Sequence, residues 1–233
     1  MELVSRWEFD IYALSLPRGH AFGNEPPIGA LRSENGITLG VLTQNQTNYS
    51  FGFLIMRRRR DSVWVVIDQG SQFKTQDEAF FQIKTHLASE AEREPIPNGI
   101  AARPPLHDLK GRTPSDVFKL LLQPSHAPAA WTLNQLYLSL PKPDKNWAGD
   151  CQTRNFHTRM WEAQLLASLR EQGLLVSQPE ESPDFRIENR AGDVAWIEAV
   201  TANPSVPYDH VNAKPTVPPT DREEIFFGSA ALR

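Results

Sequence analysis

The sequence predicts a mixed α/β fold of the α+β kind, and three observations support this class. Short runs rich in Val, Ile, Leu, Phe and Trp occupy the first part and alternate with polar or basic segments, which is typical of an antiparallel meander. A segment with the pattern of a helix start follows them. The last third then has a helical segment followed by a strand and a hairpin. We therefore expect an N-terminal β-meander plus helix and a C-terminal α/β core.

The N-terminal meander is expected to consist of three strands and one helix. The helix begins with Thr75–Glu78, a Thr-x-x-Glu capping box, and extends to about Ala91. These elements form a predicted domain over residues 1–93 that serves in binding or regulation. The three predicted strands are Gly36–Leu42, Tyr49–Met56 and Ser62–Asp68.

A linker with short helices is predicted over residues 94–150. Its first part, residues 94–112, is rich in proline and glycine. Short helices are expected from Thr113 to Leu122, where a proline occupies the first turn, and from Ala129 to Leu140. Residues 141–150 are expected to form a second break.

The predicted C-terminal domain covers residues 151–233. It begins with a helix from about Arg154 to Gln172, which Gly173 ends. A strand, a hairpin, a proline-rich loop and a last helix start at Thr220 are expected to follow. The three predicted strands are Leu174–Ser177, Phe185–Glu188 and Val194–Ala202.

Composition narrows the class of protein. The chain has 233 residues, 40% of them hydrophobic, a formal net charge of −4 and one cysteine, Cys151. An acidic total is unlike that of a protein coated in nucleic acid, although a local basic groove is still compatible with it. One cysteine allows no intrachain disulfide and favours a reducing compartment. Since the sequence shows neither a signal peptide nor a membrane-length apolar run, we expect a cytoplasmic protein with no membrane contact.

Three carboxylates stand where carboxylates are unusual. Glu162 shares a helix stripe with Leu165, Leu166 and Leu169, at offsets of three, four and seven residues. Asp184 begins the first hairpin strand. Glu198 lies in a run apolar enough for a central strand. Because a buried carboxylate costs several kcal/mol unless it is paired, protonated or metal-bound, we expect these three to converge on a hard cation such as Mg²⁺.

This pattern resembles the PD-(D/E)XK nuclease superfamily, whose fold is like that of restriction endonucleases. The resemblance rests on Pro183-Asp184, thirteen further residues, then Glu198-Ala199-Val200, with Glu162 on the preceding helix. It implies a Mg²⁺- or Mn²⁺-dependent hydrolase of phosphodiester bonds in DNA. By the same resemblance, Asp184 and Glu198 are metal ligands and Glu162 is an auxiliary ligand.

The motif departs from the superfamily at its lysine. Val200 stands at that position and can hold neither a proton nor a charge. The candidates to replace the lysine are Arg159, three residues before Glu162, and Lys214 in the proline-rich loop. Two alternatives stay open. One is a catalytically inactive module of the same fold that binds nucleic acid or protein, and the other is a structural protein whose carboxylates are incidental.

The strongest basic run is Arg57-Arg58-Arg59-Arg60. At the end of a strand pair it is a candidate for contact with nucleic-acid phosphates. A solvated hairpin end balanced by Asp61 and Asp68 is the alternative. The expected partners are thus nucleic acid, specifically DNA, and a second copy of the chain or another protein at the N-terminal domain.

Overall fold

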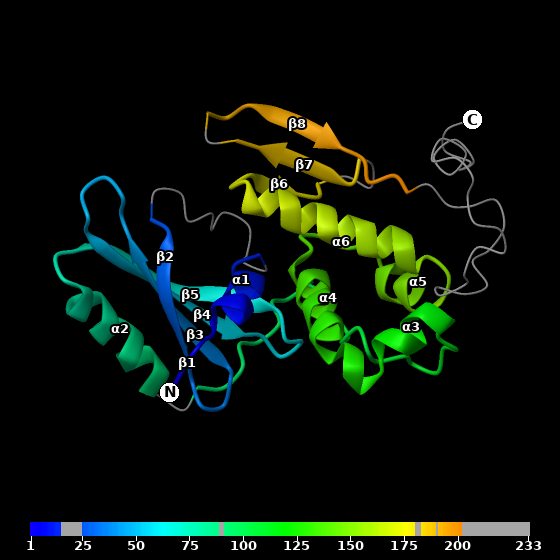
Figure 1. Ribbon diagram of the computed structural model, residues 1–233, viewed down its shortest axis with the longest axis horizontal. Helices are drawn as coiled ribbons and strands as arrows, with labels where there is room; N and C mark the ends of the chain where they lie inside the picture. The colour runs from blue at the N-terminus through cyan, green and yellow to red at the C-terminus, as the bar shows by residue number, and fades with distance from the viewer. Residues whose placement is uncertain (15–24, 89–90, 180–182, 190, 202–233) are drawn as a thin grey trace, which may run out of the picture.

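A five-stranded antiparallel sheet makes up the first half of the protein. The computed structural model describes residues 1–14, 25–88, 91–179, 183–189 and 191–201. The strands follow one another in the sheet in chain order (Figure 1). They are β1 Glu2–Leu3, β2 Pro27–Arg32, β3 Thr38–Gln44, β4 Phe51–Arg58 and β5 Trp64–Phe73.

One face of this sheet is covered by α2, Gln76–Ala88. The helix presents Ala79, Ile83 and Leu87 to the sheet, at the spacing of one helical face. Its start is a reciprocal capping box, because the Glu78 N–H donates to Thr75 Oγ1 and the Thr75 N–H donates to the Glu78 carboxylate, both at 3.3 Å. The predicted helix start is therefore confirmed.

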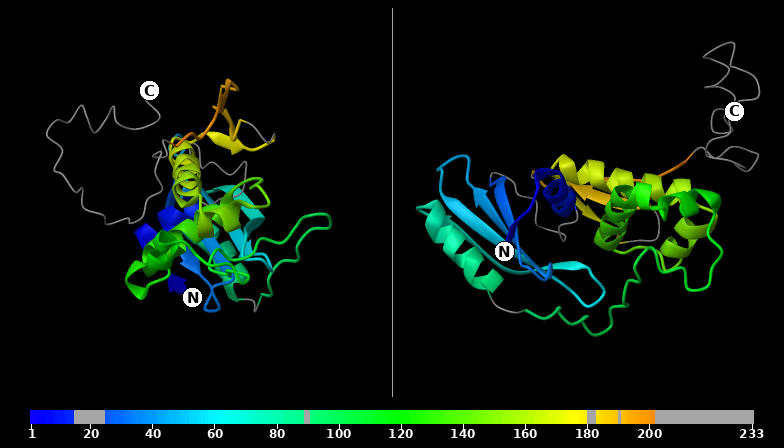
Figure 2. Two further views of the ribbon diagram at one scale, coloured as in Figure 1. Left: turned by 90° about the vertical axis from the view of Figure 1, so that its right-hand side faces the viewer. Right: turned by 60° about the horizontal axis from the view of Figure 1, so that its bottom comes forward.

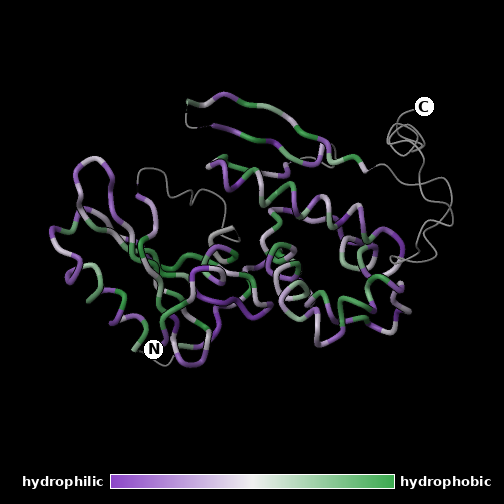
Figure 3. The backbone as a smooth tube through the Cα atoms, viewed as in Figure 1, coloured by the Kyte–Doolittle hydropathy of each residue, from purple (hydrophilic) through white to green (hydrophobic). Residues whose placement is uncertain are grey.

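The opposite face of the sheet is covered by α1, Arg6–Leu14. Phe9 of α1 packs with Leu39 and Val41 of β3, and Trp131 from the second half of the chain joins the same cluster. Figure 3 shows the hydrophobic residues concentrated along the central strands. Since β3 is buried on both faces, its central residues 39–42 (Leu-Gly-Val-Leu) are a continuous apolar run instead of alternating with polar residues.

The second half packs helices around its own core. They are α3 Asp116–Leu121, the 3-10 turn η1 Pro124–His126, α4 Ala127–Ser139, α5 Trp147–Thr153 and α6 Phe156–Glu171. A small antiparallel sheet in the order β6-β7-β8 accompanies α6, with strands Leu175–Ser177, Phe185–Glu188 and Val194–Ile197. Figures 1 and 2 show this half beside the sheet and α2, with α1 lying between the sheet and α4. Among the described helices, none is both long and apolar enough to cross a membrane.

Residues 106–112, which the sequence assigns to a linker, are packed on the helical half. Leu106 is 2% exposed within the hydrophobic core of that half. The buried Gln152 amide donates to the carbonyl oxygens of Leu106 and Asp108, both at 2.9 Å, and accepts from Arg112 at 2.8 Å. This part of the segment is therefore anchored to the core through Leu106 and Gln152, while the domain boundaries themselves stay a prediction.

The mixed α/β class with an N-terminal antiparallel meander is confirmed, but three parts of the prediction are incomplete. Strands β1 and β2 and helix α1 lie before the first predicted strand. Helix α5 begins inside the segment 141–150 that was expected to be irregular. Strand β8 ends at Ile197, whereas the sequence predicts a strand continuing to Ala202. The predicted helix start at Thr220 lies outside the described residues.

Candidate active site

Helix α6 directs Glu162 into the protein. Glu162 shares the buried face of α6 with Ala163, Leu166 and Leu169, as the apolar stripe predicts. Only 3% of Glu162 is exposed. Gly173, with φ +74°, follows the helix in the left-handed conformation that a glycine adopts without strain, which confirms the predicted stop.

The Glu162 carboxylate has three donors around it. Oε2 accepts from Trp147 Nε1 at 2.7 Å and from Arg159 at 3.0 Å, and Oε1 accepts from Gln178 Nε2 at 3.4 Å. Burial raises the pKa of Glu162 above its usual value, although Arg159 and Trp147 oppose the shift. The negative charge of Asp184 raises that pKa further, which places Asp184 within electrostatic reach of Glu162.

Arg159 connects α6 to α5 and to the loop before α5. Its guanidinium donates to Glu162 at 3.0 Å and to Asp144 and Asp150 at 3.1 Å each. Burial lowers the pKa of Arg159, but the bonds to Glu162 and Asp150 outweigh burial and raise it overall. Its Nε is buried and has no hydrogen-bond partner among the residues that the structure describes. The candidate for the missing lysine is thus the centre of an ion-pair network.

The two hairpin acids lie together. The Asp184 N–H donates to Glu198 Oε2 at 3.2 Å, and the Ala199 N–H donates to Asp184 Oδ2 at 2.7 Å. Burial raises the pKa of Asp184, the bond from Ala199 lowers it, and the charge of Glu198 raises it again. Arg159 also lowers this pKa, which places its guanidinium within electrostatic reach of the hairpin acids.

The predicted environment of Glu198 is wrong. The sequence places Glu198 inside a central apolar strand, but β8 ends one residue earlier and is an edge strand of the described three-stranded sheet. Glu198, Trp196 and Val200 are exposed. An edge strand has a neighbour on one side only, so apolar residues in it need not be buried. Thr201, shortly after β8, lies against α6, because its hydroxyl group is 2.8 Å from that of Thr158.

Glu162 and the hairpin acids are a chemically suitable set of ligands for a hard cation, which prefers carboxylate oxygen. Within the described ranges, however, no group of three or more His, Cys, Asp or Glu side chains is arranged so as to hold a metal ion. Instead, Arg159 provides the positive charge next to Glu162. The structure thus brings Asp184 and Glu198 together and gives Glu162 an arginine partner.

The residue at the position of the motif lysine, Val200, faces solvent. Val200 is 74% exposed, so the side chain there does not line the Glu162 environment. Lys214, the second candidate to replace the lysine, lies outside the described residues. Cys151 is buried, and burial raises the pKa of its thiol to about 12, which makes it a poor nucleophile.

The basic run has mostly internal contacts. Arg57 pairs with Glu94 at 2.9 Å, and the guanidinium of Arg58 lies 4.0 Å over the Trp64 ring. Arg59 is buried in a bidentate pair with Asp61. Arg60 is the exposed member of the run. Of the alternative, a solvated end balanced by Asp61 and Asp68, the pairing with Asp61 is present, but that pair is buried and Arg57 and Arg58 are half-buried. Phosphate contact at this run stays a prediction.

Sequence reasoning missed several residues that surround Glu162. Trp147, Asp144 and Asp150 come from the segment that was expected to be irregular, and Gln178 follows β6. Comparisons with family models, with curated proteins and with solved structures each found no match. The functional argument therefore rests on the geometry of these side chains.

Proposed function

We propose that the C-terminal part of this chain is a nuclease-like site that hydrolyses DNA phosphodiester bonds with Mg²⁺ or Mn²⁺. The observation that carries this proposal is the pairing of Asp184 with Glu198 across the hairpin. Reciprocal bonds of 3.2 Å and 2.7 Å join the backbone N–H of each segment to the carboxylate of the other. Two acids with thirteen residues between them in sequence are thus held together, and Asp184 lies within electrostatic reach of Glu162.

The electrostatics of the acids support this assignment. The raised pKa of Asp184 has burial as its main cause and the charge of Glu198 as a further one, and Asp184 in turn raises the pKa of Glu162. Carboxylates that raise one another's pKa are stabilised by a cation between them. Clusters of titratable groups with shifted pKa values concentrate at functional sites.

In this proposal Asp184 and Glu198 hold the cation and Glu162 is an auxiliary ligand. When bound, the metal polarises the phosphate and lowers the pKa of its water. The bond from Ala199 fixes the orientation of the Asp184 carboxylate. Arg159 stays protonated at all relevant pH values, so it would hold a phosphate oxygen and would not act as a base.

The alternative function is a catalytically inactive module of the same kind that binds nucleic acid or protein. Two observations favour it. Val200 is exposed at the place of the motif lysine, and the Arg159 guanidinium already neutralises Glu162. Metal binding and phosphodiester cleavage distinguish the two functions.

The first experiment measures metal binding. Titration calorimetry with Mg²⁺ and Mn²⁺ should give saturable binding to the wild-type chain, weakened at least about tenfold in Asp184→Asn and Glu198→Gln, since each loses a direct ligand charge. Glu171→Gln is the matched control, because it removes one negative charge from an exposed position at the end of α6. Equal affinity in all four proteins would refute the metal site.

The second experiment measures cleavage of supercoiled plasmid and of labelled oligonucleotides, with EDTA as the metal-free control. Cleavage by wild type and Glu171→Gln, lost in Asp184→Asn, supports the nuclease. Metal binding without cleavage of any substrate supports the inactive module. If wild type cleaves, Lys214→Ala tests the second candidate for the lysine role, and undiminished cleavage by this variant would exclude it.

A further inference from the structure

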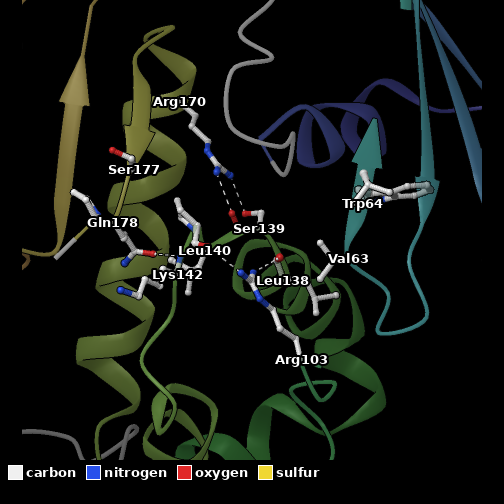
Figure 4. A pocket seen from close by; sticks show the side chains of 13 residues that line it. Val63, Trp64, Arg103, Leu138, Ser139, Leu140, Lys142, Arg170, Ser177 and Gln178 are labelled. Atoms are coloured by element: carbon white, nitrogen blue, oxygen red, sulfur yellow. Dashed lines mark hydrogen bonds between the residues drawn. The ribbon is translucent and has the colours of Figure 1, made fainter. Parts of the chain in front are cut away.

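A cavity lies between the five-stranded sheet and the helical half. Its volume is about 370 Å³, in the range of pockets for small ligands. The walls come from the start of β5, the end of α4, the last turn of α6 and the residues after β6. Residues far apart in the sequence thus enclose a space of defined shape (Figure 4).

The charge of this cavity is one-sided. Three cations line it, Arg103, Lys142 and Arg170, and none of its lining residues that the structure describes is an Asp or a Glu. Arg103 donates to the carbonyl oxygens of Leu138 and Pro141, and Arg170 donates to the carbonyl and hydroxyl oxygens of Ser139. Figure 4 shows the two guanidinium groups approaching the end of α4 from opposite sides.

Capping of α4 accounts for only part of this arrangement. The acceptors are the last oxygens of the helix, whose C-terminal dipole amounts to roughly half a negative charge. Among the lining residues that the structure describes, three carry a full positive charge and none carries a full negative charge. Burial and, after it, the charge of Arg103 together lower the pKa of Arg170 to about 10, so this side chain remains charged near neutral pH.

Neutral hydrogen-bonding groups complete the cavity. Ser177, Gln178 and Trp64 line it together with the cations. Gln178 accepts from the backbone N–H of Lys142 at 3.0 Å and donates to Glu162 at 3.4 Å. Gln178 thus joins the cavity to the candidate active site, while Arg103, Lys142 and Arg170 line the cavity and the three acids of that site do not.

We propose that this cavity binds a phosphate group, and that Arg103, Lys142 and Arg170 supply its positive charge. A tetrahedral dianion matches guanidinium and ammonium donors, which form charge-assisted hydrogen bonds. The group belongs either to a free phosphorylated small molecule or to a nucleic-acid backbone. This inference does not require that the carboxylates bind a metal.

Lys142 is the residue to change, because it is exposed, whereas Arg103 and Arg170 bind the oxygens at the end of α4. Titration calorimetry at constant low ionic strength, without phosphate buffer, measures the binding of three ligands. They are inorganic phosphate, a nucleoside monophosphate and a short single-stranded oligonucleotide. The variant is Lys142→Gln. Its matched control is Lys145→Gln, which removes a lysine from an exposed position three residues further on and outside the cavity.

We expect saturable binding that weakens roughly tenfold in Lys142→Gln and is unchanged in Lys145→Gln, as the loss of one charge-assisted bond predicts. Binding of inorganic phosphate or the monophosphate supports a free ligand, whereas Lys142-dependent binding of the oligonucleotide alone supports a backbone phosphate. Absence of all binding, or equal weakening by both variants, overturns the proposal. Asp184→Asn should leave phosphate affinity intact, so failure of the metal site and failure of this cavity are distinguishable.

Discussion

The indole N–H of Trp147 donates to the carboxylate of Glu162 at 2.7 Å, and both side chains are almost fully buried. The Trp147 ring also stacks on Tyr137, with ring centroids 4.9 Å apart. Helix α5 thereby fixes the orientation of an acid on α6. A buried carboxylate depends on such donors, because each lost bond leaves charge without compensation.

Trp147→Phe tests this bond. The substitution keeps an aromatic ring against Tyr137 but removes the donor, so we expect a loss of about 1.5–3 kcal/mol in the free energy of unfolding. The pKa of Glu162 should rise further, since the Trp147 bond lowers it. Urea denaturation measures the stability loss.

Trp161→Phe is the control on the same helix, because Trp161 is 41% exposed. Its stability should change by no more than about 0.5 kcal/mol. Equal losses in both variants would show that the hydrogen bond to Glu162 contributes nothing specific.

The pH dependence of stability should reveal the charge of Asp184. Burial is the main cause of its raised pKa, so the folded protein holds this proton more tightly than the unfolded chain. Stability is therefore lost as pH rises from the unfolded pKa of about 3.9 through the raised folded value, and stays lower above it. Asp184→Asn keeps an acceptor for the Ala199 N–H and removes this charge.

At pH 4 we expect the free energy of unfolding of Asp184→Asn to be equal to or lower than that of wild type. At pH 7 we expect it to be higher than that of wild type by up to about 1 kcal/mol, a value already reduced for solvent screening. Denaturation series from pH 4 to pH 8, at fixed ionic strength and without metal, give the difference curve. A difference that is constant with pH would contradict the raised pKa.

Local sequence patterns predicted those features of the fold that depend only on residues close together in the sequence. The reciprocal contacts of Thr75 and Glu78 follow from their spacing alone, and Ser115 accepts from the Phe118 N–H at the start of α3. The inward position of Glu162 also follows from periodicity, since Leu166 and Leu169 lie on the same face. These features need no knowledge of the distant chain.

Features that depend on distant contacts were not predictable in this way. Helix α5 has no side-chain cap at its start and contains Gly149, so its sequence resembles a loop, and it is stabilised by burial of Trp147 and Cys151. Glu198 is exposed because β8 is an edge strand of the described three-stranded sheet. A run of apolar residues does not reveal whether a strand is central or at an edge. Two partners of Arg159, Asp144 and Asp150, come from α5 and the loop before it, and they could not be inferred once α5 was missed.

Gly40 of β3 is expected to tolerate no side chain. A Cβ at this position would overlap with the Cγ2 of Ile83, where α2 packs on the sheet. Gly40→Ala should therefore cost about 1–3 kcal/mol through overpacking. Gly29→Ala in β2 is the control, because no atom lies within 4 Å of a Cβ there. Thermal melts of both variants test the tight packing of α2, and an unchanged Gly40→Ala protein would contradict it.

Arg159 and Glu162 should depend on each other for stability. Arg159→Met leaves the 4% exposed carboxylate of Glu162 without its cation, and it also removes the partner of Asp150. Breaking a buried ion pair from one side costs about 3–5 kcal/mol. The same loss means that any drop in DNA cleavage by an Arg159 variant must first be corrected for the folded fraction.

The double-mutant cycle of Arg159→Met and Glu162→Gln separates this mutual dependence from general damage. Glutamine keeps acceptors for Trp147 and removes the charge, so the double variant should be more stable than the sum of the single losses by roughly 0.5–3 kcal/mol. Urea denaturation of wild type, both single variants and the double variant at pH 7 gives this coupling energy. Strict additivity would show that Arg159 stabilises the fold through Asp144 and Asp150, in which case Glu162 is not held by the guanidinium and is available to a metal ion without displacing it.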